Sequence, residues 1–296
     1  IVDEAWTALR GEAVRPPALV VEVPRHTPPW SGRLLTFCPG CPHRSSYVAL
    51  EKALEASGNP LEECVVTGDV GCTILGMNPP HNLCRTEVAM GASIALAQGF
   101  VYAGVKRPVV AVLGDSTFFH AAIPALLNAA AHNVNLTVLV LDNSYAAMTG
   151  YQPSPSNPRT LADAVPNPLS IEELARAARV RRVRKALPYF TRRLSRVLRQ
   201  AIETPGVAVV IAEAPCVARL PRSNVIPFTV RPERCVGVES CSASCLEQIG
   251  CPAMDLDEAS GKAWIDTDRC AGCGLCAPTC PTKAIRRRLG GRWWRT

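Results

Sequence analysis

The chain has 296 residues, of which 48% are hydrophobic and 5% aromatic, with a formal net charge of +7 and 14 cysteines; this length allows one large core with a small satellite domain, or two mid-sized domains. Its arginine clusters at 179–185, 192–199 and 286–288 lack the interleaved aromatic residues of a nucleic-acid surface, so a solvated helix face or the docking of an acidic redox partner is the simpler interpretation. No apolar run reaches the roughly 18–20 residues that cross a bilayer, and we expect no signal peptide. We therefore expect no membrane among its partners and, from the arginine clusters, no nucleic acid.

The predicted elements alternate between helix and strand over most of the chain. Residues 1–34 begin with Ile1, are polar and proline-rich, and are predicted to be a linker or the tail of a missing upstream domain. Periodicity and capping residues then predict helices over 45–56, 86–104, 120–132, 171–178 and 189–204. Short apolar runs predict strands over 64–67, 108–113, 134–141, 180–183 and 207–212. Apolar strands separated by helices indicate an α/β domain over 35–214, with a doubly wound parallel sheet covered on both faces.

A change in composition follows this domain. Residues 215–234 contain prolines and basic residues without periodicity, and are predicted to be a linker. Cysteines dominate the next segment, so 235–285 is predicted to be a small ferredoxin-like α+β iron–sulfur domain, and 286–296 a basic tail.

Four cysteines near the C-terminus follow the spacing C-x₂-C-x₂-C-x₃-C and end in Pro281. This spacing is typical of a [4Fe–4S] site, whereas a zinc site needs only two cysteine pairs and has no use for the third thiolate. The cysteines of this run are Cys270, Cys273, Cys276 and Cys280. Metal-type spacing in place of disulfides indicates a reducing compartment, so we expect a cytoplasmic protein.

A second, less regular run lies upstream, with the spacing C-x₅-C-x₃-C-x₅-C and Pro252 after its last cysteine. In two-cluster ferredoxins the last cysteine of each run binds the other cluster. This rule predicts one cluster on Cys235, Cys241, Cys245 and Cys280, and its neighbour on Cys251, Cys270, Cys273 and Cys276. Because Val238 occupies the position where regular spacing has a thiolate, a damaged or vacant first site is the alternative.

Polar residues follow two apolar strands of the predicted sheet. The strand that ends at Leu113 runs directly into Gly114, Asp115, Ser116 and Thr117, and the next strand runs into Asn143 and Tyr145. Strand ends at the carboxyl edge of a parallel sheet bind ligands, and an Mg²⁺ ion on a diphosphate needs oxygen ligands there. The side chains of Asp115 and Asn143 and the carbonyl of Tyr145 are the predicted Mg²⁺ ligands in a thiamine diphosphate site. The alternative is an ordinary strand–turn in which the aspartate caps a helix.

Several motifs in order resemble one enzyme family. They are Cys38-Pro-Gly-Cys41-Pro-His43-Arg44, Gly68-Asp-Val-Gly71-Cys72, Met90-Gly-Ala-Ser93, Leu113-Gly-Asp-Ser-Thr-Phe118, Leu141-Asp-Asn143 and Ala147-Met-Thr-Gly150-Tyr-Gln-Pro153. Together with the two-cluster segment they resemble the C-terminal portion of the large subunit of indolepyruvate:ferredoxin oxidoreductases, in the 2-oxoacid:ferredoxin oxidoreductase superfamily. The resemblance covers about 35–285.

The resemblance implies oxidative decarboxylation of a 2-oxoacid, an arylpyruvate such as indolepyruvate, to an acyl-CoA, with electrons passed through [4Fe–4S] clusters to ferredoxin. It implies a third, proximal cluster on Cys38, Cys41, Cys72 and Cys216, for which zinc or four unlinked core cysteines are the alternatives. It places His43 and His120 near the substrate carbonyl as catalytic residues, with a structural hydrogen bond as the alternative for each. It also assigns Met90 and Gly91 to the cofactor, with core filling as the alternative for Met90.

Thiamine enzymes also need a carboxylate, usually Glu, on a separate pyrimidine-binding domain. A second subunit or a missing domain is therefore expected, and with it a hetero-oligomer. Two alternatives to the arylpyruvate enzyme stay open: an electron-transfer subunit whose α/β domain is a non-catalytic scaffold, and a component of a pyruvate or 2-oxoglutarate enzyme.

Overall fold

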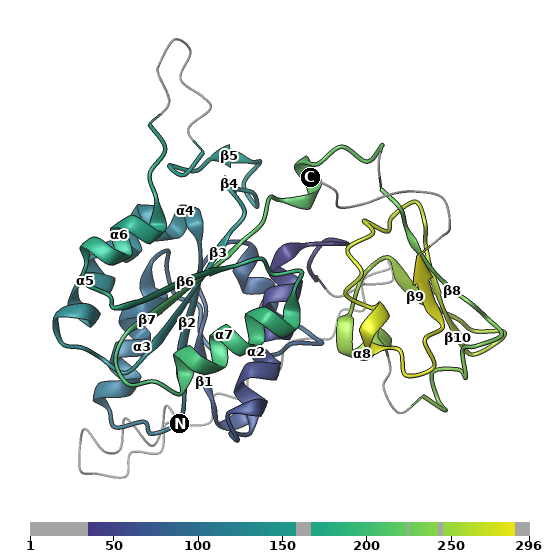
Figure 1. Ribbon diagram of the computed structural model, residues 1–296, viewed down its shortest axis with the longest axis horizontal. Helices are drawn as coiled ribbons and strands as arrows, with labels where there is room; N and C mark the ends of the chain where they lie inside the picture. The colour runs from purple at the N-terminus through teal and green to yellow at the C-terminus, as the bar shows by residue number, and fades with distance from the viewer. Residues whose placement is uncertain (1–34, 158–166, 224, 242–244, 288–296) are drawn as a thin grey trace, which may run out of the picture.

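The computed structural model describes most of the chain, over residues 35–157, 167–223, 225–241 and 245–287. The predicted linker at 1–34 and residues 288–296 of the predicted basic tail lie outside the described residues. Figure 1 shows a larger α/β body built around one sheet, and a smaller body that contains α8 and β8–β10 beside α2.

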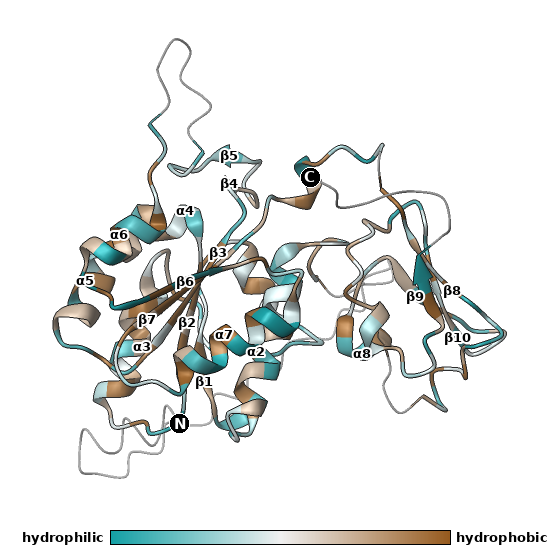
Figure 2. Ribbon diagram, viewed as in Figure 1, coloured by the Kyte–Doolittle hydropathy of each residue, from teal (hydrophilic) through white to brown (hydrophobic). Residues whose placement is uncertain are grey.

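The larger body contains a five-stranded sheet in the order β1-β2-β3-β7-β6, with every neighbouring pair parallel. Its strands are rich in valine, and Figure 2 colours the central ones as hydrophobic. The strands are β1 (Val65–Thr67), β2 (Val109–Gly114), β3 (Thr137–Asp142), β6 (Arg182–Ala186) and β7 (Ala208–Glu213). The parallel pairing of all five strands confirms the predicted doubly wound parallel sheet. Strands that are apolar on both faces need helices packed on both sides of the sheet.

Helices cover both faces of this sheet. Alternate residues of β2 enter opposite cores: Val110 and Val112 pack in one cluster with Leu50, while Ala111 packs in the other with Ile94. The first core lies under α2 (Pro42–Ala56) and α7 (Thr191–Ile202), and the second under α3 (Ala92–Tyr102), α5 (Ile123–Ala131) and α6 (Ile171–Ala177). The two-residue period of a strand thus divides the core into two layers.

Short elements connect these layers at the carboxyl edge of the sheet. A turn of α-helix, α4 (Asp115–Thr117), follows β2 and continues through the π-helical turn η3 (Phe118–Ala122) into α5. The remaining short elements are η1 (Leu61–Glu63), η2 (Cys72–Met77), η4 (Val217–Arg219) and the paired strands β4 (Tyr145–Ala146) and β5 (Gln152–Pro153).

One predicted helix begins later than its pattern indicated. The pattern predicted a start at residue 86, but α3 begins at Ala92, because Gly91 before it has a left-handed backbone with φ of 84°. The carboxylate of Asp69 accepts hydrogen bonds from the backbone N–H groups of Gly91 and Ser93, which fixes the turn that precedes the helix.

The smaller body contains part of the segment predicted to be a linker. Within 215–234, strand β8 (Phe228–Val230) pairs with β11 (Ile285–Arg287), and Phe228 is buried in the core of this body. A three-residue strand is too short for its alternation to be read from the sequence. The other elements are α8 (Cys245–Ile249), β9 (Met254–Asp257), β10 (Lys262–Ile265) and η5 (Ala277–Thr279).

Candidate functional site

A pocket of about 120 Å³ lies at the carboxyl edge of the sheet, beyond β2 and β3. It is smaller than the roughly 300–1,000 Å³ of a pocket that encloses a whole ligand. The predicted cofactor residues that line it are Gly114, Asp115, Ser116, Thr117, Asn143, Tyr145 and Met90, and His43 and Cys72 line it as well. The structure therefore brings together residues from five separate segments of the chain, as the parallel sheet requires.

Asp115 is the buried carboxylate of this pocket. Burial, together with the nearby carboxylate of Asp142, raises the pKa of Asp115 to about 7. Among the described residues, Oδ2 of Asp115 has no hydrogen-bond partner. A buried carboxylate oxygen without a donor, next to a second acidic side chain, fits a divalent cation, which would supply the missing positive charge.

Asn143 connects the end of β3 to the start of α2. Its Oδ1 accepts a hydrogen bond of 3.0 Å from the backbone N–H of Tyr145, and its Nδ2 donates to Nε2 of His43 at 3.1 Å. Burial lowers the pKa of His43 to about 4, so the imidazole is neutral and its Nε2 accepts. His43 therefore holds the amide of Asn143 in one orientation beside the pocket.

Asp69 organises the loops around the pocket, and the sequence interpretation did not assign it a role. Its Oδ1 accepts from the N–H groups of Val70 and Gly91 at 2.9 Å each, and its Oδ2 accepts from the Ser93 hydroxyl at 2.7 Å. The side chain of Thr117 donates to the carbonyl of Val70 at 3.3 Å. The Gly-Asp-Val-Gly sequence after β1 could have drawn attention to this aspartate. Its partners Gly91 and Ser93 could not have been found in the same way, because they lie more than 20 residues later in the chain.

Two predicted site residues do not line the pocket. His120 is exposed in the π-helical turn and is not among the residues that line this pocket. Gly91 lies behind the pocket, where a methyl group would come within 2.5 Å of the Ala121 Cβ, so it serves the close packing of two segments. Gly91 therefore serves the packing next to the pocket residue Met90, and the catalytic role of His120 stays a prediction.

The four cysteines of the predicted proximal cluster come from three segments and lie beside the pocket: Cys38 and Cys41 precede α2, Cys72 begins η2, and Cys216 precedes η4. Burial raises the pKa of Cys41 to about 12, with smaller contributions from Cys38 and Cys72. Burial likewise raises the pKa of Cys72 to about 11, with smaller contributions from Cys216 and Cys38. The N–H groups of the first turn of α2 point at the Cys41 sulfur and oppose its shift. Thiols gathered in this way would be stabilised as thiolates by the positive charge of a bound iron–sulfide core.

The smaller body contains two further groups of cysteines, each around its own cavity. One cavity is lined by Cys235, Cys241, Cys245 and Cys280. The other is lined by Cys251, Cys270, Cys273 and Cys276, together with Cys41 and Arg44 of the larger body. The structure thus groups Cys280 with the upstream run and Cys251 with the downstream run, which is the exchange typical of two-cluster ferredoxins.

The cysteine groups can be compared with the requirements of a cluster and of a single zinc ion. In the described part of the chain, no three His, Cys, Asp or Glu side chains are placed to hold one metal ion. Sulfurs bound to one zinc ion lie within about 4 Å of one another, given a Zn–S distance of about 2.3 Å. A cubane takes four thiolates, so the regular run with its third closely spaced thiolate, Cys276, fits a cluster better than a zinc ion held by two cysteine pairs.

Two family models match the chain. The thiamine pyrophosphate enzyme C-terminal TPP-binding domain matches residues 69–212, and the 4Fe-4S binding domain matches 263–286. The first range contains Asp115 and Asn143, and the second contains the regular cysteine run. The chain therefore contains a thiamine-binding domain followed by an iron–sulfur domain.

The curated relatives give a more specific comparison. Indolepyruvate oxidoreductase subunit IorA of Methanothermobacter thermautotrophicus is 39% identical over 255 residues, which is 85% of this chain and 40% of that protein. The same subunit of Archaeoglobus fulgidus is 34% identical, over 84% of this chain and 39% of that protein. The chain belongs to the 2-oxoacid:ferredoxin oxidoreductase superfamily. It spans about two fifths of the length of these relatives, and the predicted resemblance is confirmed.

A solved structure is similar to this chain over part of its length. The 2-oxoglutarate:ferredoxin oxidoreductase from Magnetococcus marinus, with 2-oxoglutarate, coenzyme A and succinyl-CoA bound, has a TM-score of 0.56 and 24% identity over 63% of this chain and 66% of that chain. At this identity the likeness concerns the fold alone. Within the described residues, no helix combines the length and the apolar character needed to cross a membrane.

Proposed function

We propose that the chain is the thiamine- and iron–sulfur-carrying component of a 2-oxoacid:ferredoxin oxidoreductase that converts an arylpyruvate such as indolepyruvate to an acyl-CoA. One observation carries this proposal: Cys72 both lines the Asp115 pocket and belongs to the proximal group of cysteines, so the pocket and this group lie next to each other. The group consists of Cys38, Cys41, Cys72 and Cys216. A carbon–carbon cleavage site beside a one-electron acceptor is what oxidative decarboxylation requires.

The pocket residues fit thiamine diphosphate and Mg²⁺. Asp115 and Asn143, with the carbonyl of Tyr145, would hold the cation, and Gly114 would allow the diphosphate to approach the backbone. When bound, thiamine supplies the electron sink for loss of carbon dioxide from the 2-oxoacid. The role of this chain is to orient the cofactor, since the neutral His43 and the loop fixed by Asp69 leave little freedom in the pocket wall.

The pocket lining supports an apolar substrate side chain. Met90 and Met148 line the pocket with Val70, and none of the described lining residues is Lys or Arg. The distal carboxylate of 2-oxoglutarate would need a cationic partner, whereas the ring of an arylpyruvate needs apolar surface. We therefore place arylpyruvate before 2-oxoglutarate as the substrate class.

The small pocket also supports a second subunit or domain. At about 120 Å³ the pocket holds only part of a cofactor of this size, so the remaining cofactor surface would be covered by another chain. That chain or domain would supply the activating glutamate. We propose a cytoplasmic hetero-oligomer with ferredoxin as the electron acceptor and coenzyme A as the acyl acceptor.

The test is a count of cofactors in the protein co-expressed anaerobically with its genomic neighbours. Three four-iron clusters predict about twelve irons with one thiamine. Cys251→Ala and Cys273→Ala should each lose about four irons and the same electron paramagnetic resonance (EPR) signal, although the two cysteines lie in different runs. Cys280→Ala and Cys245→Ala should likewise each lose about four irons, and both should lose the same EPR signal, that of the other cluster.

Other outcomes separate the alternatives. Clusters without retained thiamine would favour the electron-transfer subunit with a non-catalytic scaffold. A higher kcat/KM for 2-oxoglutarate than for indolepyruvate would overturn the substrate class. The exchange of cysteines between the two runs would be contradicted if the single variants Cys251→Ala and Cys245→Ala lost the same signal and Cys280→Ala lost a different one.

A further inference from the structure

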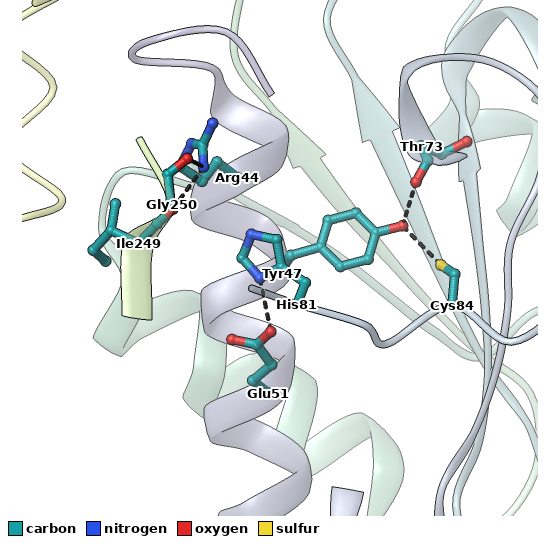
Figure 3. Close-up of polar contacts among 8 residues, drawn as sticks. All are labelled: Arg44, Tyr47, Glu51, Thr73, His81, Cys84, Ile249 and Gly250. Atoms are coloured by element: carbon teal, nitrogen blue, oxygen red, sulfur yellow. Dashed lines mark hydrogen bonds and ion pairs between the residues drawn. The ribbon is translucent and has the colours of Figure 1, made fainter. Parts of the chain in front are cut away.

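Arg44 is a fully buried arginine at the junction of the two bodies, with 1% of its surface exposed. Its Nη1 donates to the carbonyls of Ile249 and Gly250 at 2.6 and 2.7 Å, and Figure 3 shows these contacts to the smaller body. Its Nη2 donates to the carbonyl of Phe37 in the larger body. One guanidinium therefore joins the segment that precedes Cys38 to the segment that precedes Cys251.

The charge of Arg44 has no acidic partner among the described residues, where no carboxylate lies within ion-pair distance. The cysteines that would act on this charge when ionised are two from each body, Cys38, Cys41, Cys251 and Cys273, and Arg44 lines one cavity with the last three of them. Burying a cation without compensation costs several kcal/mol, of the order of the penalty per ion in a protein interior. Anionic cysteine-bound clusters on both sides would provide the compensation.

The two cysteine loops also touch directly at this place. The N–H of Gly40 hydrogen-bonds to the Cys251 sulfur, and a methyl group on Gly40 would come within 2.4 Å of the Ala271 Cβ. The segment between Cys38 and Cys41 thus packs against the segment between Cys270 and Cys273. The proximal group and the Cys251 group are neighbours joined through one hydrogen bond.

We propose that Arg44 is a positioning residue for electron transfer: it fixes the spacing between the proximal cluster and the cluster on Cys251, and its charge raises the reduction potential of both. This rests on the proposed function, because it needs clusters at both cysteine groups. Reduction adds one negative charge to a cluster, and a buried cation nearby stabilises the reduced form. Lysine would keep the charge but not the planar fork that reaches carbonyls of both bodies.

The experiment compares EPR-monitored redox titrations of the complete anaerobic complex with wild-type chain, Arg44→Gln and Arg44→Lys. Arg222→Gln is the matched control, because the Arg222 guanidinium also donates to a carbonyl near a cysteine, that of Asp268, but it is exposed. Arg44→Gln should shift the one-electron reduction equilibrium by about tenfold, or 59 mV, toward the oxidised form. Arg44→Lys should retain the wild-type potential within threefold but change the spin–spin splitting between the two reduced clusters. The control should change neither.

The outcomes distinguish the two proposals. A wild-type complex without iron at these cysteines would refute the proposed function. Full iron with unchanged potentials in Arg44→Gln would refute the role of the charge, and unchanged splitting in Arg44→Lys would refute the role in spacing. If Arg44→Gln fails to assemble, Arg44→Lys still tests both parts: unchanged splitting would refute the role in spacing, and a reduction equilibrium shifted by more than threefold despite the retained charge would refute the role of the charge.

Discussion

Replacement of Gly40 by alanine should separate the two cysteine loops that meet at this residue. Gly40 has a φ of +76°, which side chains other than glycine rarely adopt. A methyl group there would lie 2.4 Å from the Ala271 Cβ and 3.3 Å from a Val217 methyl. Neither neighbour is the far end of a long side chain, so the loop itself has to move.

The expected cost follows from these two effects. A left-handed backbone costs about 1–2 kcal/mol in a residue with a Cβ. Overpacking of a close contact adds about 1–3 kcal/mol. Gly40→Ala should therefore destabilise the protein by about 2–5 kcal/mol. Gly58 is the matched control, with a φ of +77° and nothing within 4 Å of an added methyl group, so Gly58→Ala carries only the backbone cost.

The assay is the anaerobic thermal-unfolding midpoint of the assembled protein, together with the EPR splitting between reduced clusters. Gly40→Ala should lower the midpoint more than Gly58→Ala and should alone change the splitting. Ala271→Gly, which removes the opposing Cβ, should recover the packing part of the loss when combined with Gly40→Ala. Equal midpoints for the two alanine variants, or no recovery in the double variant, would refute the contact between the two loops.

Two further predictions concern the larger body. Burial and Asp142 raise the pKa of Asp115 to about 7, so the folded cofactor-free chain keeps a proton that the unfolded chain loses near pH 4, and its stability should fall as pH rises between these values. Asp115→Asn should remove this dependence from thermal unfolding measured between pH 4.5 and 8 (roughly the range set by the two pKa values), and a retained wild-type slope would assign the dependence elsewhere. The Tyr47 hydroxyl donates to the buried carbonyl of Thr73 at 2.8 Å (Figure 3), so Tyr47→Phe should cost about 1–2 kcal/mol in urea unfolding. Tyr102→Phe, at a tyrosine 60% exposed, should cost almost nothing, and equal costs would contradict the role of this hydrogen bond.

The parallel sheet could be predicted because four of its strands, β1, β2, β3 and β7, are buried along nearly their whole length, whereas the edge strand β6 exposes Arg184 and Lys185. Runs such as 109–113 are apolar throughout, and helical patterns separate these runs. The positions of Asp115 and Asn143 at one edge then follow from the parallel arrangement alone. The start of α3 could not be predicted, since it depends on Asp69, more than 20 residues away along the chain.

The grouping of the cysteines of the smaller body could be predicted from spacing, because a known exchange rule relates the two runs. The rule carries no information on which surface of that body meets the larger one. Strand β8 escaped prediction for a related reason: its partner β11 lies more than 50 residues later, and three residues show no period. Contacts between distant segments need the fold first.

The residues from Cys41 to Arg44 contact three different parts of the protein because they form the start of α2. Successive helix residues point about 100° apart, given 3.6 residues per turn. Cys41 precedes the helix and faces the other proximal cysteines, His43 turns toward Asn143 and the thiamine pocket, and Arg44 turns toward the smaller body. One helix start therefore sets the geometry of the cofactor pocket, the proximal cysteine group and the contact to the next cysteine group. Under the proposed function, a rigid helix at this position would keep the thiamine site and the two cysteine groups nearest to it at constant spacing.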